Sequence, residues 1–217
     1  MGHPLWALFD LRVRVADLEL RVPTDDDLVE LAAIARSGIH PVDEMPFAVP
    51  WTDAPSPQFE RGFVQYHWGT RASWQPTNWT LELAVSRQGQ LAGVQGMSAR
   101  DFAVLRTVAT GSWLGQRFQR QGIGRLMRQA ILGLAFDHLG ADVATSGAFL
   151  ENVASARVSE WIGYERNGLD RVAPRGTSRD MQRYRLTREQ WAARPRPEIT
   201  VEGVDACLEL FGLPVGS

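Results

Sequence analysis

A short glycine-containing stretch carries the residues whose types and spacing are best suited to chemistry. Gly122 and Gly124 follow a predicted strand, residues 108–114, and open a predicted helix. A helix amino terminus has unpaired N–H groups and the positive end of the helix dipole, so it favours an anion. Glycine lets the backbone approach that anion closely. We predict a pyrophosphate site here, and the alternative is an ordinary strand-to-helix turn with a basic, exposed face. The side chains able to face the anion are Gln119, Arg120, Gln121 and Arg125.

Two well-known phosphate loops do not fit this stretch. A Walker loop requires Gly, four residues and then Gly-Lys-Ser/Thr, a string that the sequence lacks. A dinucleotide fingerprint requires a third small residue after Gly122 and Gly124, where this chain has Met127. The expected ligand therefore carries a pyrophosphate but is bound by neither of these two loops.

The segments around this stretch predict a mixed sheet with helices on both faces. Apolar and polar residues alternate as in half-buried strands over residues 11–15, 18–22 and 79–85, and residues 91–97, 108–114, 143–149 and 181–186 are predicted as further strands. Helical spacing and end signals predict helices over residues 25–37, 58–69, 123–140 and 153–162. An order of strands first and then strands alternating with helices indicates an α/β (α+β) fold.

Two segments together resemble a known family. The pattern Gln119-x-x-Gly122-x-Gly124, between a strand and a helix, resembles the acyl-CoA-binding signature of the GCN5-related N-acetyltransferases, the GNAT superfamily. Residues 150–164 are similar to the Asn-x-x-Ser helix, followed by Gly-Tyr or Gly-Phe, of one branch of that superfamily. This branch contains ribosomal-protein N-terminal acetyltransferases and related acetyl- and succinyltransferases. The resemblance covers residues 18–191.

The resemblance implies the GNAT fold, in which two adjacent parallel strands splay apart and the pantetheine arm of the cofactor lies between them. Here those strands would be residues 108–114 and 143–149. Backbone amides of residues 119–124 would hold the pyrophosphate, and the exposed strand edge at Trp113 and Leu114 would hydrogen-bond the pantetheine amides. Asn152 would contact the same arm or be a simple helix N-cap. The cofactor-binding residues so implied are Trp113, Leu114, Gln119, Arg120, Gln121, Gly122, Ile123, Gly124, Arg125 and Asn152.

The expected reaction is direct attack of an amine on a thioester. A thiol leaving group ionises at about pH 8.5, whereas an amine is protonated at neutral pH and must be deprotonated first. Ser155 could donate a proton to the thiolate, or be a small residue that allows close helix packing. Glu82 and Asp101 are the candidate bases, since residues 108–112 contain no acid. Each could instead be structural, with an ordered water or desolvation freeing the amine.

Two classes of function remain open. The first is an N-acyltransferase that uses acetyl-CoA, or succinyl-CoA if a cation such as Arg100 or Arg106 lies near the acyl end. The second is an inactive CoA-binding sensor or regulatory module. The amine acceptor, whether a protein N-terminus, a lysine or a small amine, is not readable from the sequence.

Composition limits the alternatives. The chain has 217 residues, 44% of them hydrophobic, and a net charge of −2, which favours a globular protein and argues against a nucleic-acid partner. The single Cys207 excludes an internal disulfide and a cysteine metal cluster, and no metal site is expected at His40 or His67. The sequence lacks a long apolar run and a signal-peptide pattern, so no membrane contact and a cytoplasmic location are expected.

Two further segments are less regular than the rest of the chain. Residues 40–78 are rich in proline and tryptophan, and they predict either the wall of an acceptor pocket or a lid that packs on its own small core. The sequence divides into a catalytic domain, residues 1–187, and an appendage, residues 188–217. The appendage contains a predicted strand at residues 199–201 and an apolar turn at residues 207–211. It is expected to cover its own domain or a neighbouring subunit of a homo-oligomer.

Overall fold

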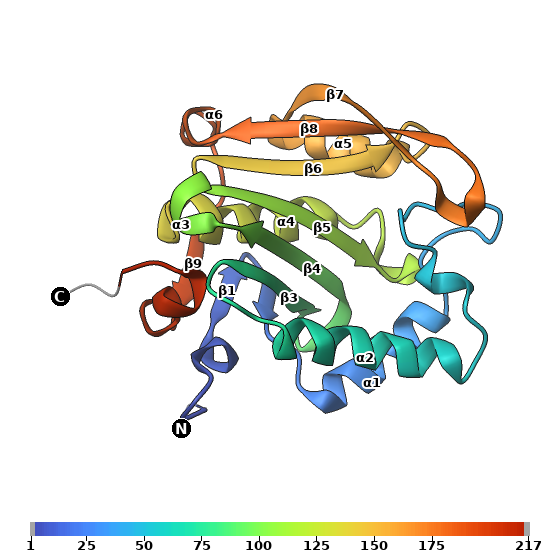
Figure 1. The fold of residues 1–217 in the computed structure, drawn as a ribbon, viewed down its shortest axis with the longest axis horizontal. Coiled ribbons are helices and arrows are strands. Elements are labelled where there is room, and N and C mark those ends of the chain that lie inside the picture. Colours follow the sequence, from blue (N-terminus) through green and yellow to red (C-terminus); the bar gives the residue numbers. More distant parts are fainter. Residues whose placement is uncertain (1–2, 215–217) are drawn as a thin grey trace.

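The computed structural model describes residues 3–214, which form one sheet with helices on both faces (Figure 1). The strands are β1 (Arg12–Val15), β2 (Leu18–Arg21), β3 (Asn78–Arg87), β4 (Gln90–Arg100), β5 (Thr107–Leu114), β6 (Val143–Phe149), β7 (Glu165–Val172), β8 (Arg179–Thr187) and β9 (Ile199–Glu202). The α-helices are α1 (Asp25–Arg36), α2 (Gln58–Ala72), α3 (Phe102–Leu105), α4 (Ile123–Gly133), α5 (Val153–Ile162) and α6 (Arg188–Ala192). Short 3-10 helices are η1 (Ala7–Asp10), η2 (Trp51–Asp53), η3 (Gln116–Phe118), η5 (Pro174–Gly176) and η6 (Asp205–Phe211), and η4 (Leu134–His138) is a π-helix.

The sheet is mixed, as predicted. Its strand order is β7-β8-β6-β5-β4-β3-β2-β1-β9. Within residues 3–214, β5 and β6 are the only parallel pair, and every other neighbouring pair is antiparallel. Helices α1 and α2 cover one face, and α4 and α5 cover the other (Figure 1). The predicted α/β class, with helices on both faces of a mixed sheet, is confirmed.

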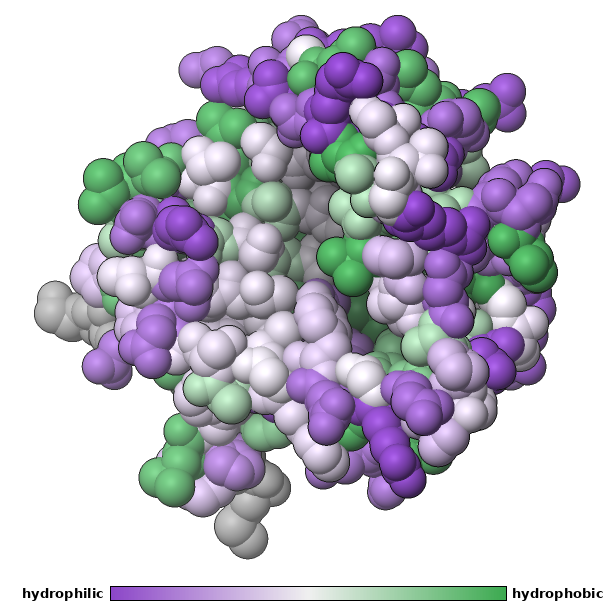
Figure 2. Space-filling view, turned by 45° about the vertical axis from the view of Figure 1, so that its right-hand side comes forward, coloured by the Kyte–Doolittle hydropathy of each residue, from purple (hydrophilic) through white to green (hydrophobic). Residues whose placement is uncertain are grey.

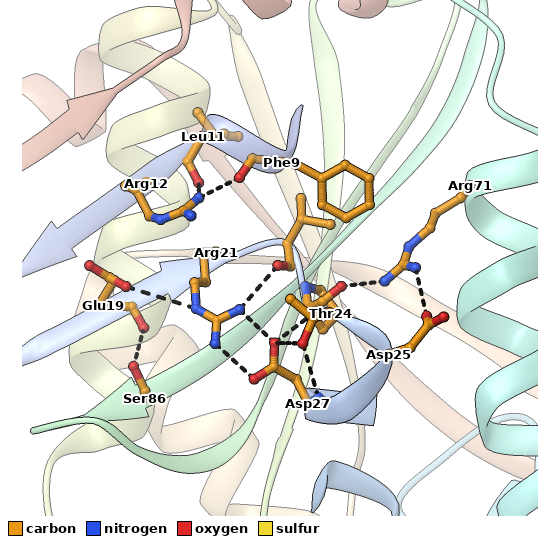
Figure 3. Close-up of polar contacts among 12 residues, drawn as sticks. Phe9, Leu11, Arg12, Glu19, Arg21, Thr24, Asp25, Asp27, Arg71 and Ser86 are labelled. Carbon is orange, nitrogen blue, oxygen red and sulfur yellow. Dashed lines mark hydrogen bonds and ion pairs between the residues drawn. The ribbon is translucent and has the colours of Figure 1, made fainter. Parts of the chain in front are cut away.

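The junction of β2 with α1 is fixed by a polar network (Figure 3). Thr24 caps α1: its hydroxyl accepts from the Asp27 N–H at 3.2 Å, and the Asp27 carboxylate accepts from the Thr24 N–H at 2.6 Å. Arg21 donates two further hydrogen bonds to Asp27, at 2.5 and 2.7 Å. Burial alone would raise the pKa of Asp27, but the hydrogen bonds from Arg21 and Thr24 outweigh it and lower that pKa. Arg71 of α2 contacts Asp25 at 3.4 Å, so one cluster links β2, α1 and α2.

Helix α4 lies in the core against the sheet. Its apolar positions recur at helical spacing, and the side chains of Ile123, Met127, Ala130 and Ile131 are buried. The predicted helix over residues 123–140 is therefore present, although its last part is the π-helix η4. This packing holds the amino terminus of α4 at the end of β5.

Strand β7 is not predictable from its sequence pattern. Most of its side chains are exposed, so the strand carries no alternation of apolar and polar residues to read. It is held by its pairing with β8, in which Glu165 lies opposite Arg185 and Val172 opposite Arg179.

The last segment of the chain packs on the rest of it. Strand β9 pairs with β1, and Val13 lies opposite Val201. The Phe211 ring in η6 is buried, with its centroid 4.9 Å from that of Trp79. Burial, together with the charge of Asp10, raises the pKa of the Cys207 thiol to about 11. The division into residues 1–187 and 188–217, and the oligomeric state, stay predictions.

Candidate functional site

The loop before α4 presents a row of free backbone donors. The N–H groups of residues 120–124 donate no hydrogen bond to any residue within 3–214, because the first bond of the helix runs from Arg125 to the Gly122 carbonyl. Gly122 has φ +82°, in the left-handed region that favours glycine, and Arg120 has φ +60°. These turns leave consecutive amides unpaired at the positive end of the α4 dipole. The geometry suits an anion such as a pyrophosphate.

The side chains near this loop have separate tasks. The Gln119 amide donates to the Ile39 carbonyl at 2.7 Å and to the Leu114 carbonyl at 2.9 Å, so it fixes the loop to the end of β5. The Gln121 amide donates to the Arg117 carbonyl at 2.7 Å. Gln119 therefore uses both N–H groups of its side chain within the protein, whereas the exposed Gln121 uses one of them. The charged side chains of the loop, Arg120 and Arg125, are the other two candidates for contact with an anion.

Arg120 and Arg125 are both exposed beside the loop. The Arg125 guanidinium lies 4.6 Å from the centre of the Trp161 ring of α5, a cation–π contact that holds it near the start of α4. Trp161 is 43% exposed, which leaves much of its indole available for another contact.

Strands β5 and β6 separate beside this loop. Their pairing covers only Thr107 with Val143, Val108 with Ala144 and Ala109 with Thr145. Beyond Ala109, β5 continues to pair with β4, and beyond Thr145, β6 continues to pair with β8. The gap between the two strands widens toward the α4 loop (Figure 1), and the space-filling view that brings this end forward shows a deep hollow (Figure 2).

The register of β4 and β5 shows which backbone groups face the gap. Gly115 donates its N–H to the Ala92 carbonyl of β4. Because backbone groups alternate in direction along a strand, those of Trp113 also face β4, and those of Ser112 and Leu114 face the gap. The Trp113 side chain packs in an aromatic cluster, 5.9 Å from Trp51 between ring centroids. Ser112, which the sequence analysis did not select, has the edge position expected for Trp113.

Helix α5 begins on the other side of the gap. The Asn152 side-chain oxygen accepts from the Ser155 N–H at 3.1 Å, so Asn152 is the N-cap of α5. Ser155 is half-buried in the first turn, and α5 contacts α4. Asn152 and Ser155 therefore lie on the same face of the sheet as the α4 loop.

Glu82 lies on the opposite face of the sheet. In the register of the three central strands, Glu82 is opposite Gly96, and Gly96 is opposite Gly111. A Cβ at Gly96 would lie 2.9 Å from a Glu82 carboxyl oxygen, so a larger residue there would displace the Glu82 carboxyl. A Cβ at Gly111 would meet nothing within 4 Å. An open strip of backbone thus runs from Glu82 to β5 at the level of the gap.

The surroundings of Glu82 change its acidity. Burial raises the pKa of its carboxyl to about 7, and the 2.8 Å hydrogen bond that Tyr66 of α2 donates opposes only part of this shift. A cavity of about 20 Å³ beside Glu82, also lined by His67 and Thr80, has room for one water molecule. A carboxyl with this pKa can exchange a proton at neutral pH.

Asp101, the other candidate base, lies elsewhere. It follows the last residue of β4, near the Thr107 end of β5, whereas the α4 loop follows the Leu114 end. Its side chain is exposed, and its backbone, with φ +49°, turns the chain into α3. The structure therefore places Glu82 level with the point where β5 and β6 separate, on the face of the sheet opposite the α4 loop. Asp101 lies near the other end of β5.

The proline-rich segment before α2 packs on the face of the sheet that carries α2 and Glu82. Trp51 stacks on Phe59 with ring centroids 5.8 Å apart, so the segment has a small aromatic core. The Arg175 guanidinium, from η5, donates two hydrogen bonds to Asp53, at 2.6 and 2.7 Å. These contacts connect the segment to the β7–β8 connection. Both interpretations of the segment, a wall and a lid with its own core, are compatible with this arrangement.

The two histidines of the segment are engaged within the protein. His67 is buried against Phe63, and burial together with the charge of Arg71 lowers its pKa to about 4. His40 contacts the Thr52 hydroxyl at 2.9 Å. Across residues 3–214, no cluster of three or more His, Cys, Asp or Glu side chains could hold a metal ion. None of the helices described is long and apolar enough to cross a membrane.

Comparison with known proteins agrees with this geometry. A family model described as an acetyltransferase (GNAT) domain matches residues 17–165. RimJ of Mycobacterium smegmatis, solved in complex with CoA-disulfide, has 18% identity and a TM-score of 0.69, over 88% of this chain and 92% of that chain. RimL, a ribosomal L7/L12 alpha-N-protein acetyltransferase solved in complex with coenzyme A, has 17% identity and a TM-score of 0.68, over 82% and 99%.

A Salmonella typhimurium acetyl transferase, described as modifying the N-terminal serine of 50S ribosomal subunit protein L7/L12, has 18% identity and a TM-score of 0.66, over 79% of this chain and 95% of that chain. At these identities the three structures show a shared fold. The family match, which covers more than half of the chain, goes further. The chain belongs to the GNAT family of acyl-CoA-dependent N-acetyltransferases.

Proposed function

We propose that this protein transfers an acyl group from acyl-CoA to a primary amine by direct attack of the amine on the thioester. The observation that carries the proposal is the separation of β5 from β6, with free amides of the α4 loop on one side of the sheet and Glu82 on the other. Donor and acceptor can then approach from opposite faces and meet in the gap.

The donor would lie along residues that the structure already presents. The amides of residues 120–124, with Arg120 and Arg125, would hold the pyrophosphate, and the backbone of Ser112 and Leu114 would hydrogen-bond pantetheine as a strand edge does. Acyl-CoA supplies an activated thioester whose thiol is a good leaving group. Ser155 would return a proton to that thiol.

Glu82 would accept the proton that the amine must lose. It is two strands away from β5, roughly 10 Å, so the proton would pass through an ordered water rather than directly. Since its pKa is about 7, a large fraction of Glu82 is ionised at neutral pH. Tyr66 would orient the carboxylate through its hydrogen bond.

The acceptor would be the N-terminal amine of a protein. The functions described for RimL and for the Salmonella enzyme support this choice. A lysine or a small amine are the alternatives. Acetyl is the donor group that the family's name gives, and a succinyl group is the alternative, which depends on a cation near the acyl end.

Two measurements test the proposal. Isothermal titration with acetyl-CoA, succinyl-CoA and free CoA should give binding, and thiol release should follow when a peptide with a free N-terminus is added. A panel with an N-blocked lysine peptide and a small diamine identifies the acceptor. Absence of binding to every CoA compound would overturn the proposal, while binding without thiol release for any amine would favour the CoA-binding sensor.

A further inference from the structure

Arg128 is a buried cation for which the protein supplies no anion. It lies on α4, and its residue is only 4% exposed. Within residues 3–214 no carboxylate lies within salt-bridge distance of its guanidinium. Removing a charge from water costs several kcal/mol unless a counter-charge compensates it. An uncompensated guanidinium inside the core is therefore unusual and indicates an anion that arrives with a ligand.

The position of Arg128 is the point where β5 and β6 separate. Its Nη1 donates to the Ser146 hydroxyl of β6 at 3.0 Å, and its Nη2 donates to the Ser112 hydroxyl of β5 at 3.3 Å. The last paired residues of the two strands, Ala109 and Thr145, come just before these serines. The guanidinium thus bridges the closed end of the gap, on the face of the sheet that carries α4 and α5.

The Nε donor of Arg128 is buried and has no hydrogen-bond partner among the described residues. An unpaired buried donor beside a permanent positive charge is suited to a further acceptor, above all to a carboxylate, which can take two hydrogen bonds from one guanidinium.

The surroundings of the guanidinium are polar. Beside the serines, the Thr110 hydroxyl lies 3.3 Å from the hydroxyl of Tyr164, and both residues are buried. A pocket that only receives the methyl group of an acetyl chain would be lined by apolar side chains, because buried polar groups that a ligand leaves unpaired cost free energy. Hydroxyl groups and a cation fit a polar acyl end instead.

We propose that Arg128 binds a carboxylate at the far end of the acyl chain, so that the preferred donor is an acyl-CoA of a dicarboxylic acid, such as succinyl-CoA. This inference rests on the proposed function, since it assumes that the acyl chain enters the gap. It replaces Arg100 and Arg106 as the cation for such a donor. Arg100 is exposed at the end of β4, and Arg106 donates to the Leu139 carbonyl at the opposite end of β5 from the α4 loop.

A ground-state carboxylate explains the observations better than the charge that develops during reaction. The guanidinium is buried and charged at all times, whereas an oxyanion or a thiolate exists only briefly. A carboxylate on the donor balances the charge throughout binding, and it adds charge-assisted hydrogen bonds.

The test compares donors by isothermal titration on the wild-type protein and on Arg128→Met, Arg128→Lys and the control Arg100→Met. The wild type should bind succinyl-CoA at least about tenfold more tightly than acetyl-CoA, the scale of one added charge-assisted hydrogen bond. Arg128→Met should bind the two donors equally, with its affinity for free CoA unchanged. Arg128→Lys should keep part of the preference, and Arg100→Met all of it. Melting temperatures without ligand show that each variant is folded.

Three results would overturn the inference. The first, which needs no variant, is a wild type that binds acetyl-CoA as tightly as succinyl-CoA. The second is a uniform loss of affinity for CoA, acetyl-CoA and succinyl-CoA in Arg128→Met, which would assign Arg128 to the CoA moiety. The third is an equal fall of kcat with both donors and no change in binding preference, which would assign it to the reaction itself. In each case binding of CoA to the wild type leaves the proposed function intact.

Discussion

Two carboxylates of this chain differ because their surroundings differ. Glu82 faces Tyr66 and the backbone of Gly96, and burial raises its pKa to about 7. Asp101 is exposed at a chain turn far from the α4 loop. Both residues are candidate bases from the sequence alone. The sequence does not distinguish them, because the difference depends on a cross-strand register and on a tyrosine from a helix. At the residue scale, the structure favours Glu82.

The raised pKa of Glu82 predicts how stability depends on pH. The folded protein holds this proton up to about pH 7, whereas an unfolded glutamate loses it at about pH 4.3. The stability that the proton contributes is therefore fully present below about pH 4.3 and is lost as the pH rises through about 7. Glutamine does not titrate, so the Glu82→Gln variant lacks this loss. From about pH 5 to about pH 8, we expect its free energy of unfolding to rise by roughly 2 kcal/mol relative to that of the wild type.

Urea unfolding at the two pH values measures this difference. Asp101→Asn is the matched control, since it also neutralises a carboxylate but at an exposed position. A difference between Glu82→Gln and the wild type that stays constant with pH would contradict the assignment of the raised pKa to Glu82.

At the scale of elements, the loop and the start of α4 were readable from the sequence and much of the rest of the site was not. Two glycines after a strand locate the free amides, because only backbone geometry is involved. Ser112, Ser146 and Arg128 lie in segments that were recognised as strands or helix by their apolar residues. Their polar side chains meet only because β5 and β6 separate, which no local pattern reports. Similarly, β7 has too few buried residues to be predicted.

The left-handed backbone of Gly122 gives an element-scale prediction. Gly122→Ala places a Cβ on a residue with φ +82°, at a cost of about 1 kcal/mol. If the backbone relaxes to avoid this strain, the amides of residues 120–124 move, and we expect CoA to bind about tenfold more weakly.

Isothermal titration with free CoA measures the effect of Gly122→Ala. The control is Gly62→Ala on α2, where an added Cβ meets nothing within 4 Å. That variant should gain up to about 1 kcal/mol of stability, because alanine favours a helix, and its affinity for CoA should not change. Equal CoA affinity of Gly122→Ala and the wild type would count against the loop as the pyrophosphate site.

At the scale of the whole molecule, the sheet joins segments from both ends of the chain. The strand predicted at residues 199–201 pairs with β1, and η6 covers Trp74 and Trp79. The apolar character of the tail was visible in the sequence, but the surface that it covers was not, because this depends on the position of β1 at the edge of the eight-stranded sheet that β9 completes.

Phe211 tests the contribution of the tail to the core. It has no exposed surface, so Phe211→Ala should lose about 3–5 kcal/mol of unfolding free energy. Leu5→Ala, at a residue that is 86% exposed, should change it by less than about 0.5 kcal/mol. Chemical denaturation measures both, and a loss below about 1 kcal/mol in Phe211→Ala would show that the tail is not part of the main core.

In the proposed reaction, an amine loses its proton to Glu82 and attacks an acyl group held in the gap between β5 and β6. The most direct test is the pH dependence of kcat/KM for wild type and Glu82→Gln with the same peptide acceptor. The ionisation of the amine, at about pH 8, affects both enzymes equally. The kcat/KM of the wild type divided by that of Glu82→Gln therefore reports the contribution of Glu82 alone. We predict a ratio that rises with pH, levels off above about pH 7 and reaches roughly 10²–10⁴. A ratio near one at every pH would show that Glu82 does not act as the base.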